Sequence, residues 1–223
     1  MSIRMIAMLT THDKTVPGAE AVFADNQGAA TAFWGFKDVG ISLPDAKKLV
    51  RRMKDAGKVT FMEPLIESEE GCLEAAQFAI DCQFDFVVGM AFYESVAKKL
   101  AGTGIKYFPT CGRRAGIPRM LYGTHQEIID DAKRILAYDG VEGICLSVYR
   151  YVDGDPEAMA AEFVASVDKP LIITGSIGND KRLEFVKNLK PWGFTIGSAL
   201  FDDSFGRYAH IYEKLDAISA KLS

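Results

Sequence analysis

The sequence alternates along its whole length between short apolar runs and longer stretches with a helical pattern. The expected strands cover residues 3–9, 29–36, 58–63, 84–90, 105–108, 141–148, 170–174 and 193–196. The expected helices cover residues 19–26, 43–57, 67–81, 93–101, 124–138, 155–167, 181–189 and 208–218. This alternation predicts a parallel sheet covered by helices, because each parallel strand needs a long crossover connection.

The stretch 43–57 shows the helical pattern clearly. Its apolar residues recur at the spacing of one helix face, at Ala46, Leu49, Val50 and Met53. Pro44 stands in the expected first turn and Gly57 follows the last one, which is the usual asymmetry of helix ends. By contrast, the stretch 19–26 carries only a weak pattern.

Eight such strand–helix units in 223 residues favour an α/β fold of the closed (β/α)8 barrel type, with residues 1–223 as a single domain. An open doubly wound sheet is the alternative. That fold usually has fewer strands and favours a Gly-x-Gly-x-x-Gly turn after the first of them. The residues that follow Leu9 contain no such turn, so the sequence favours the barrel.

The composition excludes several classes of protein. With 26 basic and 30 acidic residues and a net charge of −4, the chain lacks the basic surplus of a nucleic-acid-binding protein. Its cations do not run in blocks, and no stretch approaches the roughly 18 apolar residues of a membrane span. We therefore expect neither a nucleic-acid nor a membrane partner.

Cysteine and histidine spacing bears on compartment and cofactors. The four cysteines form no Cys-x-x-Cys pair, so we expect a reduced, cytoplasmic protein without a zinc knuckle or a redox dithiol. No set of His, Cys and Asp has metal-ligand spacing, so we expect no metal and no other cofactor. Phe201 and Phe205 hint at a partner surface, which leaves a homo-oligomer possible.

The sharpest functional signal is a pair of Gly-Ser turns after the last two strands. Gly175, Ser176 and Gly178 follow one strand, and Gly197 and Ser198 follow the next. Glycine lets the backbone approach an anion closely, and the loops after strands seven and eight of a barrel commonly bind phosphate. The alternative is that these glycines are ordinary turns. Two such turns on adjacent strands favour the phosphate site.

The same segments resemble the C-terminal quarter of the ribulose-phosphate-binding barrels, a superfamily that includes phosphoribosylanthranilate isomerase, the histidine-pathway isomerase and indole-glycerol-phosphate synthase. The resemblance rests on Ile-Ile-Thr-Gly-Ser-Ile-Gly at 172–178 and Gly-Phe-Thr-Ile-Gly-Ser-Ala-Leu at 193–200. It implies backbone contacts from those five residues to the phosphate of a sugar-like metabolite. The catalytic motifs of the subfamilies do not match, since the first strand ends without their Asp or Cys. No subfamily is identified.

Lys37 and Glu63 are the candidate catalytic residues. Each ends an apolar run, and the two runs are neighbouring strands of the expected barrel. Glu63 is a candidate general base, and Lys37 a candidate oxyanion partner or Schiff-base amine. The alternative is a salt bridge without chemistry. The period of two in a strand leaves open whether either side chain faces the mouth.

Three further residues are candidate substrate contacts. His12 follows the first strand next to Asp13, where the two could act as an acid–base pair. Arg113 and Arg114 stand in a loop rich in Gly and Pro after the fifth strand, where bidentate donors could hold a second phosphate or a carboxylate. A solvated loop position is the alternative for each of the three.

Together these features predict an enzyme acting on a small phosphorylated sugar-like molecule. An isomerase or epimerase that works by proton transfer heads the expectation. A Lys-dependent aldolase or lyase is one alternative, and a regulatory barrel that binds a phosphoester without turnover is another. Barrels host many chemistries, so the fold alone does not choose among them.

Overall fold

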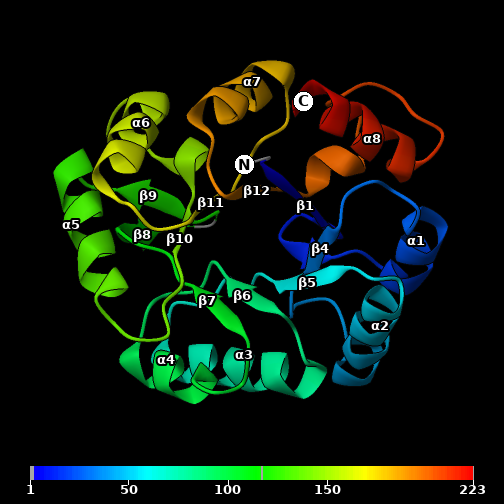
Figure 1. The fold of residues 1–223 in the computed structure, drawn as a ribbon, viewed down its shortest axis with the longest axis horizontal. Coiled ribbons are helices and arrows are strands. Elements are labelled where there is room, and N and C mark those ends of the chain that lie inside the picture. The colour runs from blue at the N-terminus through cyan, green and yellow to red at the C-terminus, as the bar shows by residue number, and fades with distance from the viewer. Residues whose placement is uncertain (1–2, 117, 223) are drawn as a thin grey trace.

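The computed structural model describes residues 3–116 and 118–222 and forms a (β/α)8 barrel, as the sequence predicts (Figure 1). The barrel strands are β1 (Arg4–Met8), β4 (Phe33–Phe36), β5 (Val59–Met62), β6 (Phe86–Val88), β7 (Lys106–Phe108), β10 (Ile144–Leu146), β11 (Leu171–Ile173) and β12 (Gly193–Ile196). They pair in parallel in the order β10-β11-β12-β1-β4-β5-β6-β7. Parallel bridges from Tyr107 to Val141 and from Thr110 to Cys145 join β7 to β10, which closes the barrel.

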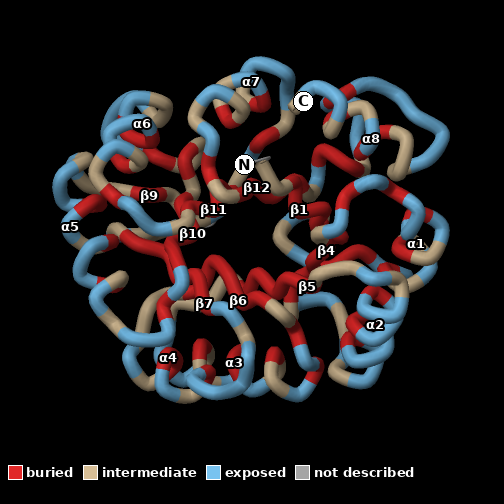
Figure 2. The backbone as a smooth tube through the Cα atoms, viewed as in Figure 1, coloured by how far each residue is buried: buried red, intermediate tan, exposed pale blue. Residues whose placement is uncertain are grey.

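Helices form the outer ring, with buried strands inside them (Figures 1 and 2). They are α1 (Ala19–Asn26), α2 (Leu43–Asp55), α3 (Glu69–Cys82), α4 (Glu94–Leu100), α5 (His125–Leu136), α6 (Pro156–Ser166), α7 (Asp180–Leu189) and α8 (Ile211–Leu222). The buried face of α2 consists of the four apolar residues that the periodicity predicts. Ser42 caps this helix by accepting from the Asp45 N–H, which satisfies a donor that has no partner inside the helix.

Two short antiparallel hairpins depart from the predicted alternation. One joins β2 (Thr10–Thr11) to β3 (Lys14–Thr15) after β1, and the other joins β8 (Arg113–Ala115) to β9 (Met120–Tyr122) after β7. Strands of two or three residues are too short to show an alternating pattern, so the sequence suggests only loops there. The barrel strands themselves are shorter than the apolar runs; for example, only 144–146 of the run 141–148 is paired as a strand.

Phe201 and Phe205 do not form the exposed aromatic surface that their position suggests. Phe205 is buried and Phe201 is half-buried against the main core. Both therefore pack within this chain and give no support to a homo-oligomer. No helix in the described part of the chain combines the length and the apolar character needed to cross a membrane.

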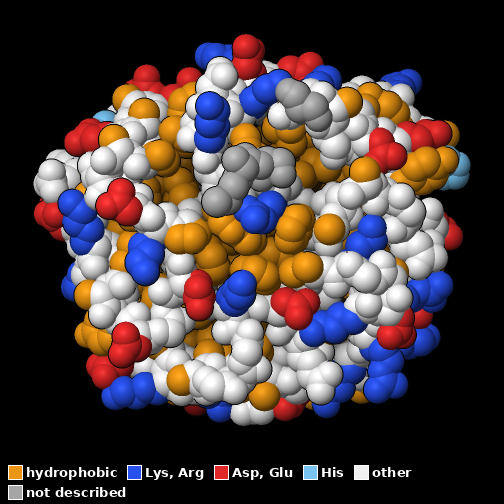
Figure 3. All heavy atoms as spheres, viewed as in Figure 1, with side chains coloured by type: hydrophobic (Ala, Val, Ile, Leu, Met, Phe, Trp, Pro, Cys, Tyr) orange, Lys and Arg blue, Asp and Glu red, His pale blue; other side chains and the backbone are white. Residues whose placement is uncertain are grey.

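Large side chains fill the N-terminal half of the barrel. The inner cluster consists of Ile6, Met8, Phe61, Phe86, Val88, Phe108, Cys145 and Ile172, with Phe33, Val59 and Trp192 packed against it. The Trp192 ring lies 5.4 Å from the Phe86 ring and 5.7 Å from the Phe108 ring, and the Arg4 guanidinium lies 4.5 Å above it. Figure 3 views this end, where hydrophobic side chains gather at the centre. These side chains fill the N-terminal half of the barrel, so the C-terminal end is where a ligand site can form.

Asp85 stabilises the N-terminal end. Its carboxylate accepts from the Thr60 N–H and hydroxyl at 2.8 Å and from the Lys54 ammonium at 2.9 Å. Burial alone would raise the pKa of this carboxyl, but the bonds from Lys54 and Thr60 outweigh burial and hold the pKa below its usual value. Asp85 thus links β5 and α2 to the start of β6.

We expect Asp85→Ala to lower the free energy of unfolding by about 2 kcal/mol at neutral pH, because charge-assisted hydrogen bonds are lost. A carboxyl whose pKa is lower in the folded state stabilises the fold above its unfolded pKa of about 4, and this contribution is lost as the pH falls through the folded value. Urea unfolding at pH 7 and pH 3 measures the difference. A difference in the free energy of unfolding between wild type and variant that is equally large at pH 7 and pH 3 would contradict this account.

Candidate active site

A cavity of about 310 Å³ opens at the C-terminal ends of the barrel strands. Each barrel strand, or the segment that follows it, contributes to the wall: Thr10, Lys37, Glu63, Gly89, Thr110, Ser147, Thr174 and Gly197. The strand order places β12 opposite β6 across the closed barrel, with β1, β4 and β5 on one side and β7, β10 and β11 on the other. The cavity therefore has two ends and two flanking walls.

Lys37 and Glu63 both face the cavity, which the sequence leaves open. Phe33 packs in the barrel interior, so the period of two along β4 turns Gly35 and then Lys37 inward as well. Lys37 is 4% exposed and Glu63 is 9% exposed, and Nζ lies 3.7 Å from Oε2. The two candidate catalytic residues thus form a buried ion pair at the mouth.

Asp13 forms a second ion pair with Lys37, although its neighbour His12 is the residue that the sequence predicts as a substrate contact. His12 and Asp13 have φ values of 49° and 60°, so they form the tight turn of the β2–β3 hairpin. The turn sends the Asp13 carboxylate into the cavity, 3.6 Å from Lys37 Nζ, while His12 is exposed and is not part of the cavity wall. The structure thus brings Asp13, and not His12, to the predicted site.

Thr15 ties the hairpin to the backbone of Lys37. Its hydroxyl donates to the Lys37 carbonyl at 2.6 Å and accepts from the Lys37 N–H at 3.0 Å. Two hydrogen bonds from one buried hydroxyl fix the end of β4 against β3. The same hairpin therefore positions both members of the Asp13–Lys37 pair.

The two Gly-Ser turns lie side by side at the β12 end of the cavity. All five residues predicted to contact phosphate, namely Gly175, Ser176, Gly178, Gly197 and Ser198, belong to the wall. No hydrogen bond among residues 3–116 and 118–222 uses the N–H of Gly178, Ser198 or Ala199. Unpaired N–H groups at the start of helical turns are the donors that an anion needs. We call these two turns the glycine cradle.

Neighbouring side chains hold the cradle and give it positive charge. Asn179 caps α7 by accepting from the Arg182 N–H at 2.9 Å. The buried Lys214 of α8 donates to the backbone carbonyls of Ala199 and Asp202, which fixes the second turn. Arg150 lies against Gly175, where an added Cβ would come within 3.3 Å of Arg150 Nε, and its Nη2 is 3.4 Å from Asp13. Arg150 is thus a cation beside the cradle.

Hydroxyl groups line the wall opposite Lys37 and Glu63. Ser147 and Thr174 are hydrogen-bonded to each other, with their oxygens 3.1 Å apart, and the Cys145 thiol lies 3.6 Å from the Thr174 hydroxyl. Burial raises the pKa of the Cys145 thiol to about 12. It also raises the pKa of Cys111. Both thiols therefore stay protonated near neutral pH, which argues against a cysteine nucleophile.

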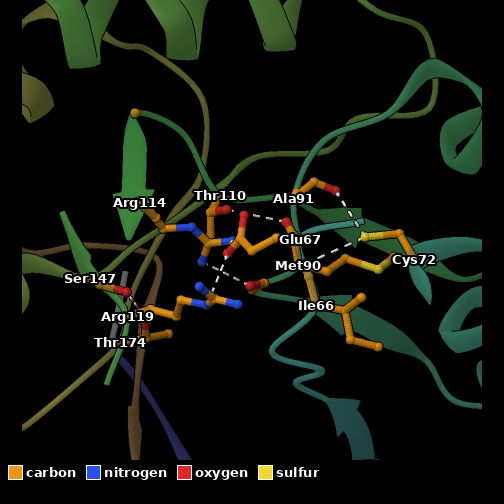
Figure 4. Close-up of polar contacts among 12 residues, drawn as sticks. Ile66, Glu67, Cys72, Met90, Ala91, Thr110, Arg114, Arg119, Ser147 and Thr174 are labelled. Carbon is orange, nitrogen blue, oxygen red and sulfur yellow. Dashed lines mark hydrogen bonds and ion pairs between the residues drawn. The ribbon is translucent and has the colours of Figure 1, made fainter. Parts of the chain in front are cut away.

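The two predicted arginines lie next to each other on the β8–β9 hairpin, but only one of them reaches the cavity. Arg114 enters the cavity wall with its side chain only 5% exposed, whereas Arg113 is exposed and lies 4.6 Å from the Tyr122 ring, outside the wall. Arg119, which no sequence motif marks as a site residue, also lines the cavity. Figure 4 shows Arg114 and Arg119 converging on Glu67. In the described chain, no group of three or more His, Cys, Asp or Glu side chains is placed to hold a metal.

Comparisons with known proteins agree on the fold. No family profile and no curated protein sequence matches this chain. A 4-hydroxy-2-oxoglutarate/2-dehydro-3-deoxyphosphogluconate aldolase from TTHB1 superposes with a TM-score of 0.66 at 16% identity, covering 100% of this chain and 96% of the aldolase. Phosphoribosylanthranilate isomerase from Thermotoga maritima gives 0.61 at 16% identity and 98% coverage of both chains. N-acetylmannosamine-6-phosphate 2-epimerase from Clostridium perfringens gives 0.62 at 13% identity, covering 88% and 86%.

These likenesses confirm the predicted (β/α)8 fold, and phosphoribosylanthranilate isomerase, a member of the superfamily that the last quarter of the sequence resembles, is among the proteins that share it. They span almost the whole chain, whereas the sequence resemblance covers only the last quarter. At identities of 13–16% they carry no residue roles from one protein to another. No subfamily is identified, and the chemistry has to be argued from the cavity itself.

Proposed function

We propose that this protein is an enzyme that isomerises or epimerises a small phosphorylated sugar-like molecule by proton transfer. The observation that carries the proposal is the buried Lys37–Glu63 pair, 3.7 Å apart, in the same cavity as the glycine cradle. The names of the structural neighbours, which include an isomerase and an epimerase, support this class of reaction. The buried free cysteines fit the expected cytoplasmic location, which we propose as well.

The substrate's phosphate binds at the cradle in this proposal. Backbone N–H groups of Gly178, Ser198 and Ala199 donate to its oxygens, and the Arg150 guanidinium offsets part of its charge. Anchoring the phosphate at the β12 end directs the carbon skeleton over the barrel mouth. The Lys37–Glu63 pair then flanks the carbons rather than the phosphate.

The acid–base step follows from this placement. Glu63 removes the proton from a carbon next to the substrate carbonyl, and negative charge moves to the carbonyl oxygen. The Lys37 ammonium stabilises that enediolate oxygen, and Asp13 holds the ammonium from its other side. Glu63 then returns the proton to the former carbonyl carbon while the proton of the neighbouring hydroxyl moves to the former carbonyl oxygen, so the carbonyl forms on the adjacent carbon and the isomer results.

Schiff-base chemistry at Lys37 is the second candidate. Its Nζ contacts two carboxylates at 3.6 and 3.7 Å, longer than a normal hydrogen bond, and the neighbours include an aldolase. In that case a neutral Lys37 attacks the carbonyl carbon and water leaves. The flanking carboxylates favour the isomerase, because they suit an ammonium partner. A sensing barrel needs no buried acid–base pair, so the pair also favours an enzyme over a sensor.

Borohydride trapping tests the choice. We expect that sodium borohydride, added with phosphorylated ketoses and aldoses, leaves the protein mass unchanged, because no imine forms. Peptide mass spectrometry on wild type and on Lys37→Arg, which cannot form the imine, provides the readout and its control. A reduced adduct on Lys37 that is absent from the variant would replace the isomerase with the lyase.

Gly178→Ala tests the cradle without disturbing the fold. An added Cβ at Gly178 meets only Ala199 Cβ and Ser204 Oγ, both at 3.8 Å, so there is room for it between the two turns. We expect binding of glucitol 6-phosphate to weaken at least about tenfold, because the methyl group occupies the space of a phosphate oxygen. Isothermal titration calorimetry measures the loss, with an unchanged melting temperature as the control. Gly197 is a poorer choice, since its Cβ would lie 2.6 Å from Thr10 Oγ1. Unaltered affinity in Gly178→Ala would place the phosphate elsewhere.

A further inference from the structure

We infer that Arg114 and Arg119 form a second anion subsite, which binds a carboxylate at the end of the substrate remote from its phosphate. The inference rests on the proposed function, because the glycine cradle fixes which end of the substrate reaches the arginines. It deepens that function by assigning the substrate to the phosphorylated sugar acids, and it assigns Glu67 as the group that occupies the subsite before the substrate binds.

Arg114 is a buried donor that is not fully satisfied. Its side chain is 5% exposed, and its Nη1 donates to the Gly89 carbonyl at 3.1 Å. Its Nη2 lies 2.6 Å from Glu67 Oε1, but neither atom has a partner in hydrogen-bond geometry among the described residues. Buried charged groups normally have well-oriented partners, so a buried guanidinium in the cavity wall whose close ion pair lacks hydrogen-bond geometry points to a ligand.

Arg119 adds a second cation at the same point. It immediately precedes β9 in the β8–β9 hairpin, its side chain is 34% exposed, and its Nε lies 3.8 Å from the same Glu67 oxygen. Two guanidinium groups therefore share one carboxylate, which leaves a net positive charge at this wall of the cavity (Figure 4). An anion entering the cavity meets these two groups opposite the cradle.

Glu67 shows which kind of anion fits. It belongs to the loop between β5 and α3, is 30% exposed, and its Oε1 contacts both arginines. A planar carboxylate matches the fork of a guanidinium, so a substrate carboxylate can take the same place when Glu67 turns out to solvent. The Glu67 backbone is held separately, by the Tyr93 hydroxyl at 2.6 Å, so its side chain can move without the loop.

The placement of the two subsites gives the substrate its direction. Arg114 contacts Gly89 just after β6, and the cradle follows β11 and β12, on the far side of the barrel. A linear molecule that spans the two passes Lys37 and Glu63 on one side and the Ser147 and Thr174 hydroxyls on the other. The central carbons of a hydroxylated, phosphorylated acid would thus meet the acid–base pair.

A matched pair of ligands tests the subsite. 6-Phosphogluconate and glucitol 6-phosphate differ only in a terminal carboxylate in place of a hydroxymethyl group. We expect the wild-type protein to bind 6-phosphogluconate at least about tenfold more tightly, because a charge-assisted contact is gained. Arg119→Met should reduce this ratio to below about threefold and leave the affinity for glucitol 6-phosphate unchanged. Arg113→Met, on the same hairpin but outside the cavity, should keep the full ratio.

Glu67→Gln should change the affinity for 6-phosphogluconate in the direction opposite to Arg119→Met. Removing the resident charge should tighten 6-phosphogluconate binding about threefold or more, whereas loss of a purely structural Glu67 would weaken it.

Equal affinities of the wild type for the two ligands would overturn the carboxylate subsite. The proposed phosphate site would still stand if Gly178→Ala weakens the binding of glucitol 6-phosphate. Failure of both ligands to bind would overturn both proposals. Titration calorimetry with melting curves for each variant separates lost binding from lost folding.

Discussion

Glu63→Gln is expected to lower kcat at least about 100-fold while changing the affinity for phosphorylated ligands by less than about threefold. The amide keeps the volume of the side chain and can still receive a hydrogen bond, but it cannot take a proton. Glu63 is 9% exposed and lies next to Lys37, so no solvent group replaces it easily. The assay is turnover of whichever substrate a panel of phosphorylated ketoses, aldoses and sugar acids identifies.

Lys37 should show a graded response. Lys37→Ala is expected to lower kcat by roughly 100–1,000-fold, because the oxyanion loses its partner. Lys37→Arg retains the positive charge and should preserve part of the activity of an isomerase, but none of that of an imine enzyme. Exchange of the substrate's carbon-bound proton in deuterated water reports the proton-transfer step directly. Full turnover in both Lys37→Ala and Glu63→Gln would mean that the catalytic groups lie elsewhere in the cavity.

The barrel could be predicted because its elements carry strong, repeated signals. Each strand is an apolar run and most helices show a periodic face, and the parallel order then follows from the connections. Lys37 and Glu63 could be named for the same reason, since both end such runs. Their inward direction could not be read from sequence, because a shift of one residue along a strand reverses every side chain.

The hairpins explain which site residues the sequence misplaces. Neighbouring residues in a strand point to opposite faces, so Arg113 leaves the cavity and Arg114 enters it, and nothing in the dipeptide decides between them. The side chains of His12 and Asp13 also diverge, because both residues have positive φ and form a tight turn. Arg119 reaches Glu67 from the loop of the β8–β9 hairpin, which supplies part of the cavity wall. Such contacts depend on the twist of short segments that have no sequence period.

Gly143→Ala is expected to lower the free energy of unfolding by at least about 3 kcal/mol, which is roughly a 6–12 °C drop in melting temperature for a chain of this size. A Cβ at Gly143 would lie 2.2 Å from the Pro170 carbonyl oxygen and 2.4 Å from the Phe108 ring. Neither atom can yield easily: Pro170 O accepts from the Ile144 N–H at 3.0 Å, and Phe108 packs in the barrel interior.

The position of Gly143 makes this cost larger than that of ordinary overpacking. It stands where β10 begins, beside the junction with β7 that closes the barrel through the Tyr107–Val141 and Thr110–Cys145 bridges. Moving β10 outward to admit a methyl group would strain the seam on one side and the β10–β11 pairing on the other. Gly28→Ala is the matched control, because nothing lies within 4 Å of its Cβ position and its φ is not positive. Chemical unfolding should show Gly28→Ala at or slightly above wild-type stability, and a Gly143→Ala protein as stable as this control would mean that the seam yields to a methyl group.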